Sequence, residues 1–341
     1  MSVFAGMQGR SLLSLDDLTD SEIRNLLRLA SGLKTRKKAR IPGNLLQGRN
    51  IALIFEKTST RTRCAAVVAA VDEGATAEYL DVSHIHLGKK ESISDTARVL
   101  GRMFDGIVFR GHAQETAVEL AKHAGVPVWN GLTDEHHPTQ TLADLMTVQE
   151  NFGEFKGVKM VYVGDGRNNV ANSLMLGCAK VGLDFVNCTP DSLSPDPELV
   201  ERARSAARDK GSMVEISHDP ATAVAGANVV YTDVWVSMGE EAETENRIEL
   251  LRPYQVSMDL MERTGNMASG KVIFLHCLPA IHDRNTLYAR ESGEMEVTND
   301  VFESEFSKVF DQAENRMHTI KALLVATLSS DAADIRSLCA V

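Results

Sequence analysis

The chain alternates short apolar runs with longer stretches in which apolar residues recur at helical spacing. The runs in the first half predict strands at Ile51–Phe55, Thr76–Leu80, Gly106–Phe109 and Val126–Trp129. The runs in the second half predict strands at Lys159–Val163, Asp184–Cys188, Met213–Ile216, Val229–Thr232 and Val272–Leu275. Helices fit the gaps, as at Ile93–Met103, Gln114–Ala124 and Asp196–Asp209. Strands that alternate with helices are typical of parallel sheets covered on both faces, so the predicted fold class is α/β.

Two such series predict two doubly wound parallel-sheet domains linked by long helices. A chain of 341 residues is also longer than a single hydrophobic core usually supports. We expect a first domain over residues 1–138 and a second over residues 150–312, joined by a connecting helix over residues 139–150. A last helix, over residues 314–330, is expected to pack back on the first domain and complete it.

Composition narrows the class of protein. Hydrophobic residues make up 43% of the chain and charged residues 24%, which is ordinary for a soluble globular protein. The formal net charge of −11 argues against a nucleic-acid partner, because a polyanion demands a basic surface. The basic run Lys34–Arg40 is therefore interpreted as a solvated helix end and loop. No apolar run approaches the roughly 20 residues that span a bilayer, so no membrane association is predicted.

The cysteines and the first residues predict the compartment. Five scattered cysteines without CxxC spacing indicate reduced thiols rather than a disulfide framework. The segment Met1–Arg10 lacks the charged and apolar regions of a secretory signal peptide. We therefore expect a cytoplasmic protein.

The segment Ile51–Arg63 is the richest in candidate chemistry. In doubly wound sheets, ligands bind beyond the carboxyl ends of the strands, and here an apolar run ends in hydroxyls and cations. These groups are Ser59, Thr60, Arg61, Thr62 and Arg63. The helix that follows offers free N–H donors and a partial positive charge at its N-terminus, so the turn predicts a site for phosphate or another compact dianion. The structural alternative is a helix cap with solvated arginines.

Two further groups suit the same anion. Arg110 directly follows a predicted strand, where it can reach a bound anion or form a surface salt bridge. Pro138 fits the first turn of a helix, where its missing N–H costs nothing, so that His137, Thr139 and Gln140 present donors to a carbonyl or phosphate oxygen. The adjacent histidines also invite a zinc site, but no paired cysteine or suitably spaced carboxylate accompanies them.

The second half carries turns that suit a small polar substrate. Gly164 and Gly166 begin a dinucleotide-type turn, but Asn169 stands where the third glycine of such a turn belongs, which disfavours a nicotinamide cofactor. Asp233 is placed to bind an ammonium group, and the turn with Ser237 and Met238 is placed to bind a carboxylate. Together they predict an amino-acid site, with a helix cap and core packing as the structural alternative.

Cys277 follows another predicted strand and can act as nucleophile, base or donor. A thiol nucleophile needs a histidine base. His276 is adjacent in sequence, but neighbouring strand residues face opposite ways, which disfavours a cysteine hydrolase. Arg316 lies in the last predicted helix, whose other face is apolar.

Taken together and in this order, the motifs resemble those of the transcarbamylases, the family of aspartate and ornithine carbamoyltransferases. Ser59–Arg63 is similar to their carbamoyl phosphate signature, and His137–Gln140 is similar to their second motif. Asp233 with Ser237–Gly239, and His276–Pro279, resemble the branch of the family that uses ornithine. The resemblance runs from about Leu12 to Leu328.

The resemblance implies a reaction and a set of site residues. The carbamoyl group of carbamoyl phosphate would be transferred to the δ-amine of L-ornithine to give L-citrulline and phosphate, in arginine biosynthesis or, in reverse, in deiminase-type catabolism. The residues implied to hold carbamoyl phosphate are Ser59, Thr60, Arg61, Thr62, His86, Arg110, His137, Pro138, Thr139, Gln140, Cys277, Leu278 and Arg316. The residues implied to bind ornithine are Asn169, Asp233, Ser237 and Met238. The implied catalytic group comprises Arg61, Arg110, His137, Gln140, Cys277 and Arg316.

The resemblance also implies no metal and no organic cofactor, and a homotrimer, or an assembly of trimers, with active sites shared between neighbouring subunits. One position departs from the family pattern. His86 stands where the family usually has a glutamine that reaches a neighbouring subunit's site, although a histidine can still donate to phosphate.

Three alternatives remain open on the sequence alone. A relative that uses putrescine or a modified ornithine would keep much of the same chain, but putrescine has no carboxylate for the turn at Ser237–Gly239 to bind. A catalytically silent subunit or ligand-binding regulator can share the fold. A dinucleotide-dependent oxidoreductase is disfavoured by the missing glycine of its turn.

Overall fold

The computed structural model describes residues 4, 6–83, 85–236, 244–286, 289–290 and 293–340. The candidate residues Ser237 and Met238 lie outside the described residues. The chain forms two compact units, the first comprising residues 1–146 and 314–341 and the second residues 147–313. Each unit is built on one parallel sheet, which confirms the predicted α/β class with two doubly wound parallel sheets. The helices α5 (Pro138–Phe152) and α13 (Val309–Leu328) both continue from one unit into the other.

The sheet of the first unit has the strand order β2-β1-β3-β4, and every pair in it is parallel. The strands are β1 (Asn50–Phe55), β2 (Thr76–Asp81), β3 (Gly106–Arg110) and β4 (Val128–Leu132). The other helices of this unit are α1 (Asp20–Lys38), α2 (Thr60–Val71), α3 (Ile93–Leu100), α4 (Gln114–Ala124) and α14 (Ala332–Leu338), with a short 3-10 helix at Leu15–Asp17.

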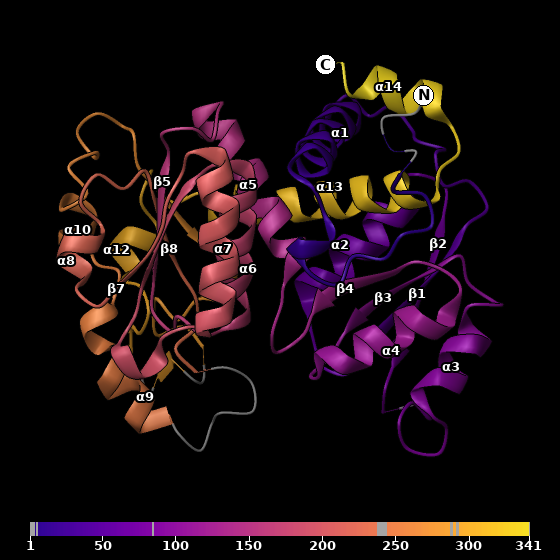
Figure 1. Cartoon of the computed structure of the whole chain (residues 1–341), viewed down its shortest axis with the longest axis horizontal. Coiled ribbons are helices and arrows are strands. Elements are labelled where there is room, and N and C mark those ends of the chain that lie inside the picture. The colour runs from indigo at the N-terminus through magenta and orange to yellow at the C-terminus, as the bar shows by residue number, and fades with distance from the viewer. Residues whose placement is uncertain are drawn as a thin grey trace. The chain divides into compact units, whose positions relative to one another are not determined.

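Both faces of the first sheet are covered. Strand residues on one face, Ala52, Ile54, Ile107 and Phe109, pack with the buried side of α3 and α4 in a single apolar cluster. Figure 1 shows α3 and α4 on this side of the sheet, with α1, α2 and α13 on the other. Because the strands are buried from both sides, they appear in the sequence as continuous apolar runs.

The sheet of the second unit has the strand order β7-β6-β5-β8-β9 and is also entirely parallel. Its strands are β5 (Lys159–Val163), β6 (Asp184–Cys188), β7 (Val214–Ser217), β8 (Val229–Thr232) and β9 (Ile273–His276). Its helices are α6 (Asn169–Val181), α7 (Pro197–Lys210), α8 (Pro220–Ala223), α9 (Thr244–Leu251), α10 (Met258–Glu262) and α12 (Asn299–Phe302), with 3-10 helices at Asp191–Leu193 and Arg252–Tyr254.

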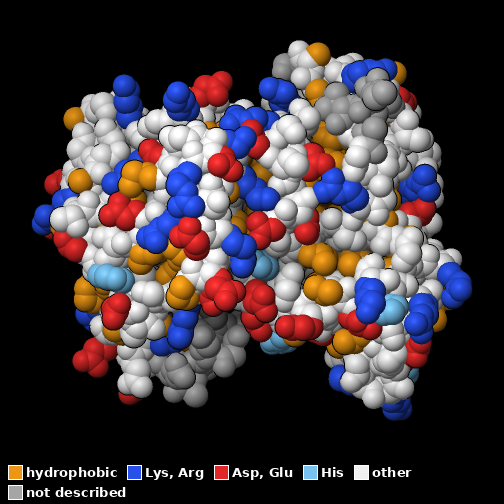
Figure 2. All heavy atoms as spheres, in the orientation of Figure 1, with side chains coloured by type: hydrophobic (Ala, Val, Ile, Leu, Met, Phe, Trp, Pro, Cys, Tyr) orange, Lys and Arg blue, Asp and Glu red, His pale blue; other side chains and the backbone are white. Residues whose placement is uncertain are grey.

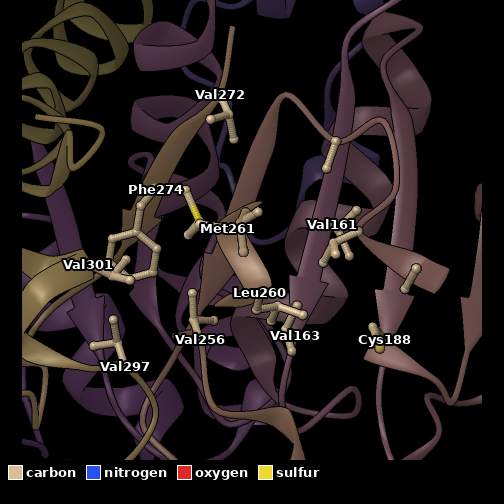
Figure 3. Packing of buried hydrophobic residues seen from close by; sticks show 14 of the residues in the cluster. Val161, Val163, Cys188, Val256, Leu260, Met261, Val272, Phe274, Val297 and Val301 are labelled. Carbon is tan, nitrogen blue, oxygen red and sulfur yellow. The ribbon is translucent and has the colours of Figure 1, made fainter. Parts of the chain in front are cut away.

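Figure 3 shows how one face of the second sheet is packed. Val161, Val163 and Phe274 of the strands meet Leu260 and Met261 of α10. This core is rich in β-branched side chains, which suit a central parallel strand. It fixes β5, β8 and β9 side by side, so that the loops at their carboxyl ends also lie side by side.

Three of the nine predicted strands have the bounds of the observed ones, namely β5, β6 and β8. The fourth prediction began too early: β4 starts at Val128, directly after Pro127, which has no N–H to donate to a neighbouring strand. The basic run forms a helix end and a turn, as predicted, but its first residue is not solvated. The helix α1 extends to Lys38, and Lys34 is buried, with its ammonium group 2.7 Å from the Asn315 side-chain oxygen.

The molecular surface carries charges of both signs. Figure 2 shows Lys and Arg side chains interspersed with Asp and Glu side chains over the face in view. Among the described residues, none of the helices combines the length and the apolar character that crossing a membrane requires.

Candidate active site

The predicted anion turn lies between β1 and α2 in the first unit. Ser59 caps α2, because its hydroxyl oxygen accepts a hydrogen bond from the Thr62 backbone N–H at 3.2 Å. The first turn of α2 contains no acidic side chain, so its positive end is not neutralised locally. Arg61 is half-buried rather than solvated, whereas Arg63 is exposed and lies over the Tyr79 ring, 3.8 Å from its centroid. The structural alternative therefore holds for Ser59, which is a cap, but not for Arg61.

Arg316 of α13 joins this turn to the start of α5. It is buried, and one of its terminal nitrogens lies 2.5 Å from the Thr62 hydroxyl and 2.8 Å from Nε2 of His137. Thr62 and Arg316 are 254 positions apart in the chain, so only the fold brings them together. The second predicted motif and the last helix thus meet the anion turn within the first unit.

Three guanidinium groups act on the buried His137 ring. Burial lowers the pKa of His137 well below its ordinary value, and the charges of Arg316, Arg110 and Arg61 lower it further. His137 is therefore neutral. Because its Nε2 accepts from Arg316, its remaining proton is on Nδ1. Arg110, the last residue of β3, is itself buried. Three cations converging on one neutral ring produce a strongly positive site that suits a dianion.

Gln140 and Thr139 present polar atoms into the same region. Pro138 is the first residue of α5, as predicted, and Gln140 lies in the first turn that follows. The Gln140 amide nitrogen donates to an Asp144 carboxylate oxygen at 2.7 Å, which orients its own oxygen Oε1. Oε1 of Gln140 and the Thr139 hydroxyl are buried and have no hydrogen-bond partner among the described residues. A buried acceptor of this kind suits a ligand that brings an N–H donor.

A second group of predicted residues meets in the second unit, at the ends of β8 and β9. The Cys277 thiol donates to an Asp233 carboxylate oxygen at 3.0 Å, and the Val234 backbone N–H donates to the same oxygen at 2.8 Å. Burial raises the pKa of the Asp233 carboxyl, and the neighbouring His276 and these two donors partly offset that rise. The other Asp233 oxygen lies 3.4 Å from the side-chain nitrogen of Asn168. A buried carboxylate of this kind suits a cationic partner.

His276 is hydrogen-bonded to the loop after β9. Its position also corrects the argument that His276 and Cys277 face opposite ways as neighbouring strand residues. The strand ends at His276, so the alternation of strand side chains does not extend to Cys277. The Leu278 N–H donates to Nδ1 of His276 at 2.9 Å, and Nε2 is 3.3 Å from a Glu296 oxygen that also accepts from the Ile281 N–H at 2.7 Å. Leu278 has a φ of 61° and is followed by a cis peptide bond to Pro279.

Three side chains that could bind a metal lie close together at the ends of β8 and β9. Among the described residues, Asp233, His276 and Cys277 place ligand atoms within 4.8 Å of one another. Both His276 nitrogens, however, are already engaged by Leu278 and Glu296, and the thiol donates to Asp233. A cation would have to break these hydrogen bonds before it could be coordinated.

Asn169 and His86, the remaining predicted residues that the structure describes, lie outside the two groups of contacts described above. Asn169 is the half-buried first residue of α6, and its neighbour Asn168 caps that helix. His86 is exposed, in a turn where its carbonyl accepts hydrogen bonds from residues 89–91. Sequence reasoning missed Asn168 and Glu296. Asn168 was detectable as a helix cap from the motif Asn168-Asn169, whereas nothing local marks Glu296.

The chain resembles known proteins along nearly its whole length. Residues 10–150 match the family described as aspartate/ornithine carbamoyltransferase, carbamoyl-P binding domain. Residues 156–327 match the family described as aspartate/ornithine carbamoyltransferase, Asp/Orn binding domain. A catabolic ornithine carbamoyltransferase from Bacillus licheniformis is 57% identical over 334 residues, which cover 96% of this chain and 99% of that protein. An ornithine carbamoyltransferase from Streptococcus pyogenes is 55% identical over 329 residues, covering 95% and 97%. The solved ornithine carbamoyltransferase from Pyrococcus furiosus matches with a TM-score of 0.87 and 45% identity, covering 96% and 98%.

Proposed function

Because this chain belongs to the aspartate/ornithine carbamoyltransferase family, we propose that it transfers the carbamoyl group of carbamoyl phosphate to the δ-amine of L-ornithine, giving L-citrulline and phosphate. The observation that carries this proposal is the charge of Arg61, Arg110 and Arg316, which together lower the pKa of the buried His137, with Arg316 in direct contact with its ring. A site of that charge is expensive to bury unless an anion binds there. The phosphate group of carbamoyl phosphate is such an anion, and it is also the group that departs in the reaction.

The phosphate end is assigned to the anion turn. Ser59, Thr60, Arg61 and Thr62 lie at the positive end of α2, and Arg110 lies at the end of the neighbouring strand β3. Charge builds up on the phosphate as the bond to the carbamoyl carbon breaks. Preorganised donors at that position are each worth about 3–4 kcal/mol in comparable sites.

The carbamoyl end is assigned to His137, Pro138, Thr139 and Gln140. A neutral His137 with its proton on Nδ1 can donate to the carbamoyl oxygen without bringing a fourth cation into the site. The buried Gln140 oxygen can accept from the carbamoyl NH₂ group, whose two protons distinguish it from an acetyl group. The backbone of Cys277 and Leu278 and the guanidinium of Arg316 are assigned to the same end of the substrate.

Ornithine is assigned to the second unit. The Asp233 carboxylate would bind the α-ammonium group, and Asn169, Ser237 and Met238 would bind the other groups of the amino-acid backbone. Burial of Asp233 beside the Asn168 amide favours a cationic ligand, since an ammonium group would compensate the desolvated charge. Cys277, hydrogen-bonded to Asp233, would lie near the δ-amine, which must lose a proton before it can attack.

The assembly is assigned as a homotrimer, or a group of trimers, with active sites completed by His86 of a neighbouring copy. Two features support self-association. The strand β2 is an edge of its sheet, and Val71 at the end of the neighbouring α2 is 58% exposed. Sedimentation velocity tests this assignment, since a monomer at micromolar concentration would contradict it.

The cellular role is assigned to cytoplasmic arginine metabolism. The described cysteines are all free thiols, which fits a reducing compartment. The Bacillus licheniformis relative carries the description catabolic, so the proposal includes the reverse reaction, in which phosphate cleaves citrulline.

A panel of acceptors tests the function. The purified chain is incubated with carbamoyl phosphate and either L-ornithine, putrescine or L-aspartate, and the carbamoylated product is quantified. We expect product with ornithine at a kcat/KM at least about 10²-fold above that with putrescine, because putrescine has no groups for the amino-acid turn to bind. Preference for putrescine or aspartate would overturn the assignment of the substrate.

A further inference from the structure

Three loops of the first unit lead to Arg61, Arg110 and His137, and backbone hydrogen bonds join neighbouring loops. The loops follow β1, β3 and β4, which lie in the sheet order β1-β3-β4. Between the loops after β1 and β3, the Glu56 N–H donates to the Arg110 carbonyl at 2.8 Å. Between the loops after β3 and β4, the Gly111 N–H donates to the Leu132 carbonyl at 2.9 Å and the Asp134 N–H to the His112 carbonyl at 2.8 Å.

An ion pair joins the two outer loops directly. The Lys57 ammonium group donates to the Asp134 carboxylate, although β1 and β4 are not neighbours in the sheet. Two strand spacings, roughly 10 Å, separate such strands, so the lysine side chain must extend over the end of β3. Lys57 is only 8% exposed, whereas Asp134 is 57% exposed. The lysine is therefore held in place by packing, and the aspartate closes the link.

Gly111, directly after β3, leaves room for the side chains of neighbouring residues. A Cβ atom at Gly111 would lie 2.3 Å from a Glu56 carboxylate oxygen and 2.3 Å from the Phe109 ring. That same Glu56 oxygen accepts from the His112 N–H at 2.9 Å. A side chain at this position would displace the Glu56 carboxylate and the Phe109 ring, so glycine keeps the space over the end of β3 open.

We propose that Asp134 is a positioning residue for the carbamoyl phosphate site, because it ties the loop that presents His137 to the loops that present Arg61 and Arg110. This inference rests on the proposed function. Asp134 binds no substrate itself. It lies three residues before His137, its carboxylate accepts from Lys57 of the β1 loop, and its backbone N–H donates to the His112 carbonyl of the β3 loop. Loss of the tie lets the His137 loop shift relative to the two arginines, and misplacement of about 1 Å is enough to cost up to 10²-fold in rate.

The same sheet offers a matched control at the amino ends of its strands, opposite the candidate site. Asp105 precedes β3, donates its N–H to the Asn50 carbonyl at 2.8 Å and pairs with Arg49 at 2.7 Å. Like Asp134, Asp105 combines one backbone hydrogen bond to a neighbouring segment with one ion pair, but both of its partners lie at the start of β1. Asp105→Asn removes the pair with Arg49 and weakens the acceptor of the Asn50 N–H, so it perturbs the same sheet at least as much without touching the carbamoyl phosphate site.

The test compares Asp134→Asn with Asp105→Asn by steady-state kinetics. We expect Asp134→Asn to lower kcat/KM for carbamoyl phosphate about tenfold, with the KM for ornithine changed less than about twofold, and Asp105→Asn to leave both within about twofold. Asp134→Glu, which keeps the carboxylate, is expected to recover part of the loss. Equal effects of the two asparagine variants would overturn the proposal.

A double-mutant cycle identifies the partner. Lys57→Met and Asp134→Asn act through one link, so the double variant is expected to be no worse than the more impaired single variant. Losses that multiply would overturn the tie. Absence of citrulline formation by the unmodified chain would contradict the proposed function instead. Calorimetric binding of inorganic phosphate to the same variants then tests the tie without turnover, and again Asp134→Asn must bind more weakly than Asp105→Asn.

Discussion

Replacing Arg316 by methionine separates the electrostatic role of this residue from its packing. Methionine is apolar and flexible, so it fills the space of the buried alkyl part of Arg316 but carries no charge. The change removes the hydrogen bonds from Arg316 to the Thr62 hydroxyl and to Nε2 of His137. Since both acceptors lose a charged donor, the site loses contacts of about 1.5–3 kcal/mol each.

The expected effect on stability is smaller than that sum. Arg316 is one of three guanidinium groups around His137, and removing it also removes repulsion among buried like charges. The two changes oppose each other, so we expect the free energy of unfolding to change by no more than about 2 kcal/mol. The loss of a cation near the departing phosphate has no such compensation. We expect kcat/KM for carbamoyl phosphate to fall by about 10²- to 10³-fold, which corresponds to about 3–4 kcal/mol.

A pH profile makes the prediction specific to the electrostatic argument. Arg316 is the charge that contributes most to lowering the pKa of His137, after burial itself. Without it, the pKa of His137 rises toward its ordinary value, and the acid limb of kcat/KM moves to higher pH. Arg49→Met, at the exposed end of the same sheet, serves as the control and is expected to leave the profile unchanged. Turnover within threefold of the unmodified chain, or an acid limb that does not move, would refute the reasoning.

Three further changes are expected to have distinct outcomes. Arg61→Ala should cost about 3 kcal/mol of transition-state stabilisation, read as a fall of about 10²-fold in kcat/KM for carbamoyl phosphate, and near-normal turnover would show that the anion turn is misassigned. Cys277→Ser keeps a donor to Asp233 and should change the KM for ornithine less than Cys277→Ala, whereas equal KM values would remove the role of that hydrogen bond. Burial lowers the pKa of His318 from its ordinary 6.5 to about 4, so between these values the unfolded state binds more protons and stability falls as the pH falls. Denaturation of His318→Gln should therefore show a slope shallower by up to about 1.4 kcal/mol per pH unit over that range, and an unchanged slope would contradict this.

The sequence predicts most of the fold because the buried strands are also the apolar runs. The strands β5, β6 and β8 match their predictions at both ends, since each is covered on both sides and is bounded by polar turns. Lys34 shows where such reasoning fails. It lies in a basic run that looks solvated, but it is buried against Asn315, which is 281 positions away in the chain.

The candidate site is predictable only where its residues lie in compact motifs. Ser59–Arg63 and His137–Gln140 are marked by their own local chemistry, so the sequence alone is enough to single them out. Glu296 and Asp134 could not be found in this way. Each acts through a partner that the sequence does not place beside it, namely His276 for Glu296 and Lys57 for Asp134.

The fate of isotopically labelled carbamoyl phosphate tests the central claim most directly. The purified chain is incubated with ¹³C-labelled carbamoyl phosphate and L-ornithine, and citrulline and phosphate are followed in one sample by ¹³C and ³¹P NMR. The account predicts that, once the phosphate from spontaneous decay is subtracted, citrulline and phosphate appear at the same rate and in equal amounts, and that both appear faster than that decay. Enzyme-dependent release of phosphate without citrulline, or no acceleration over the decay without enzyme, would contradict the account.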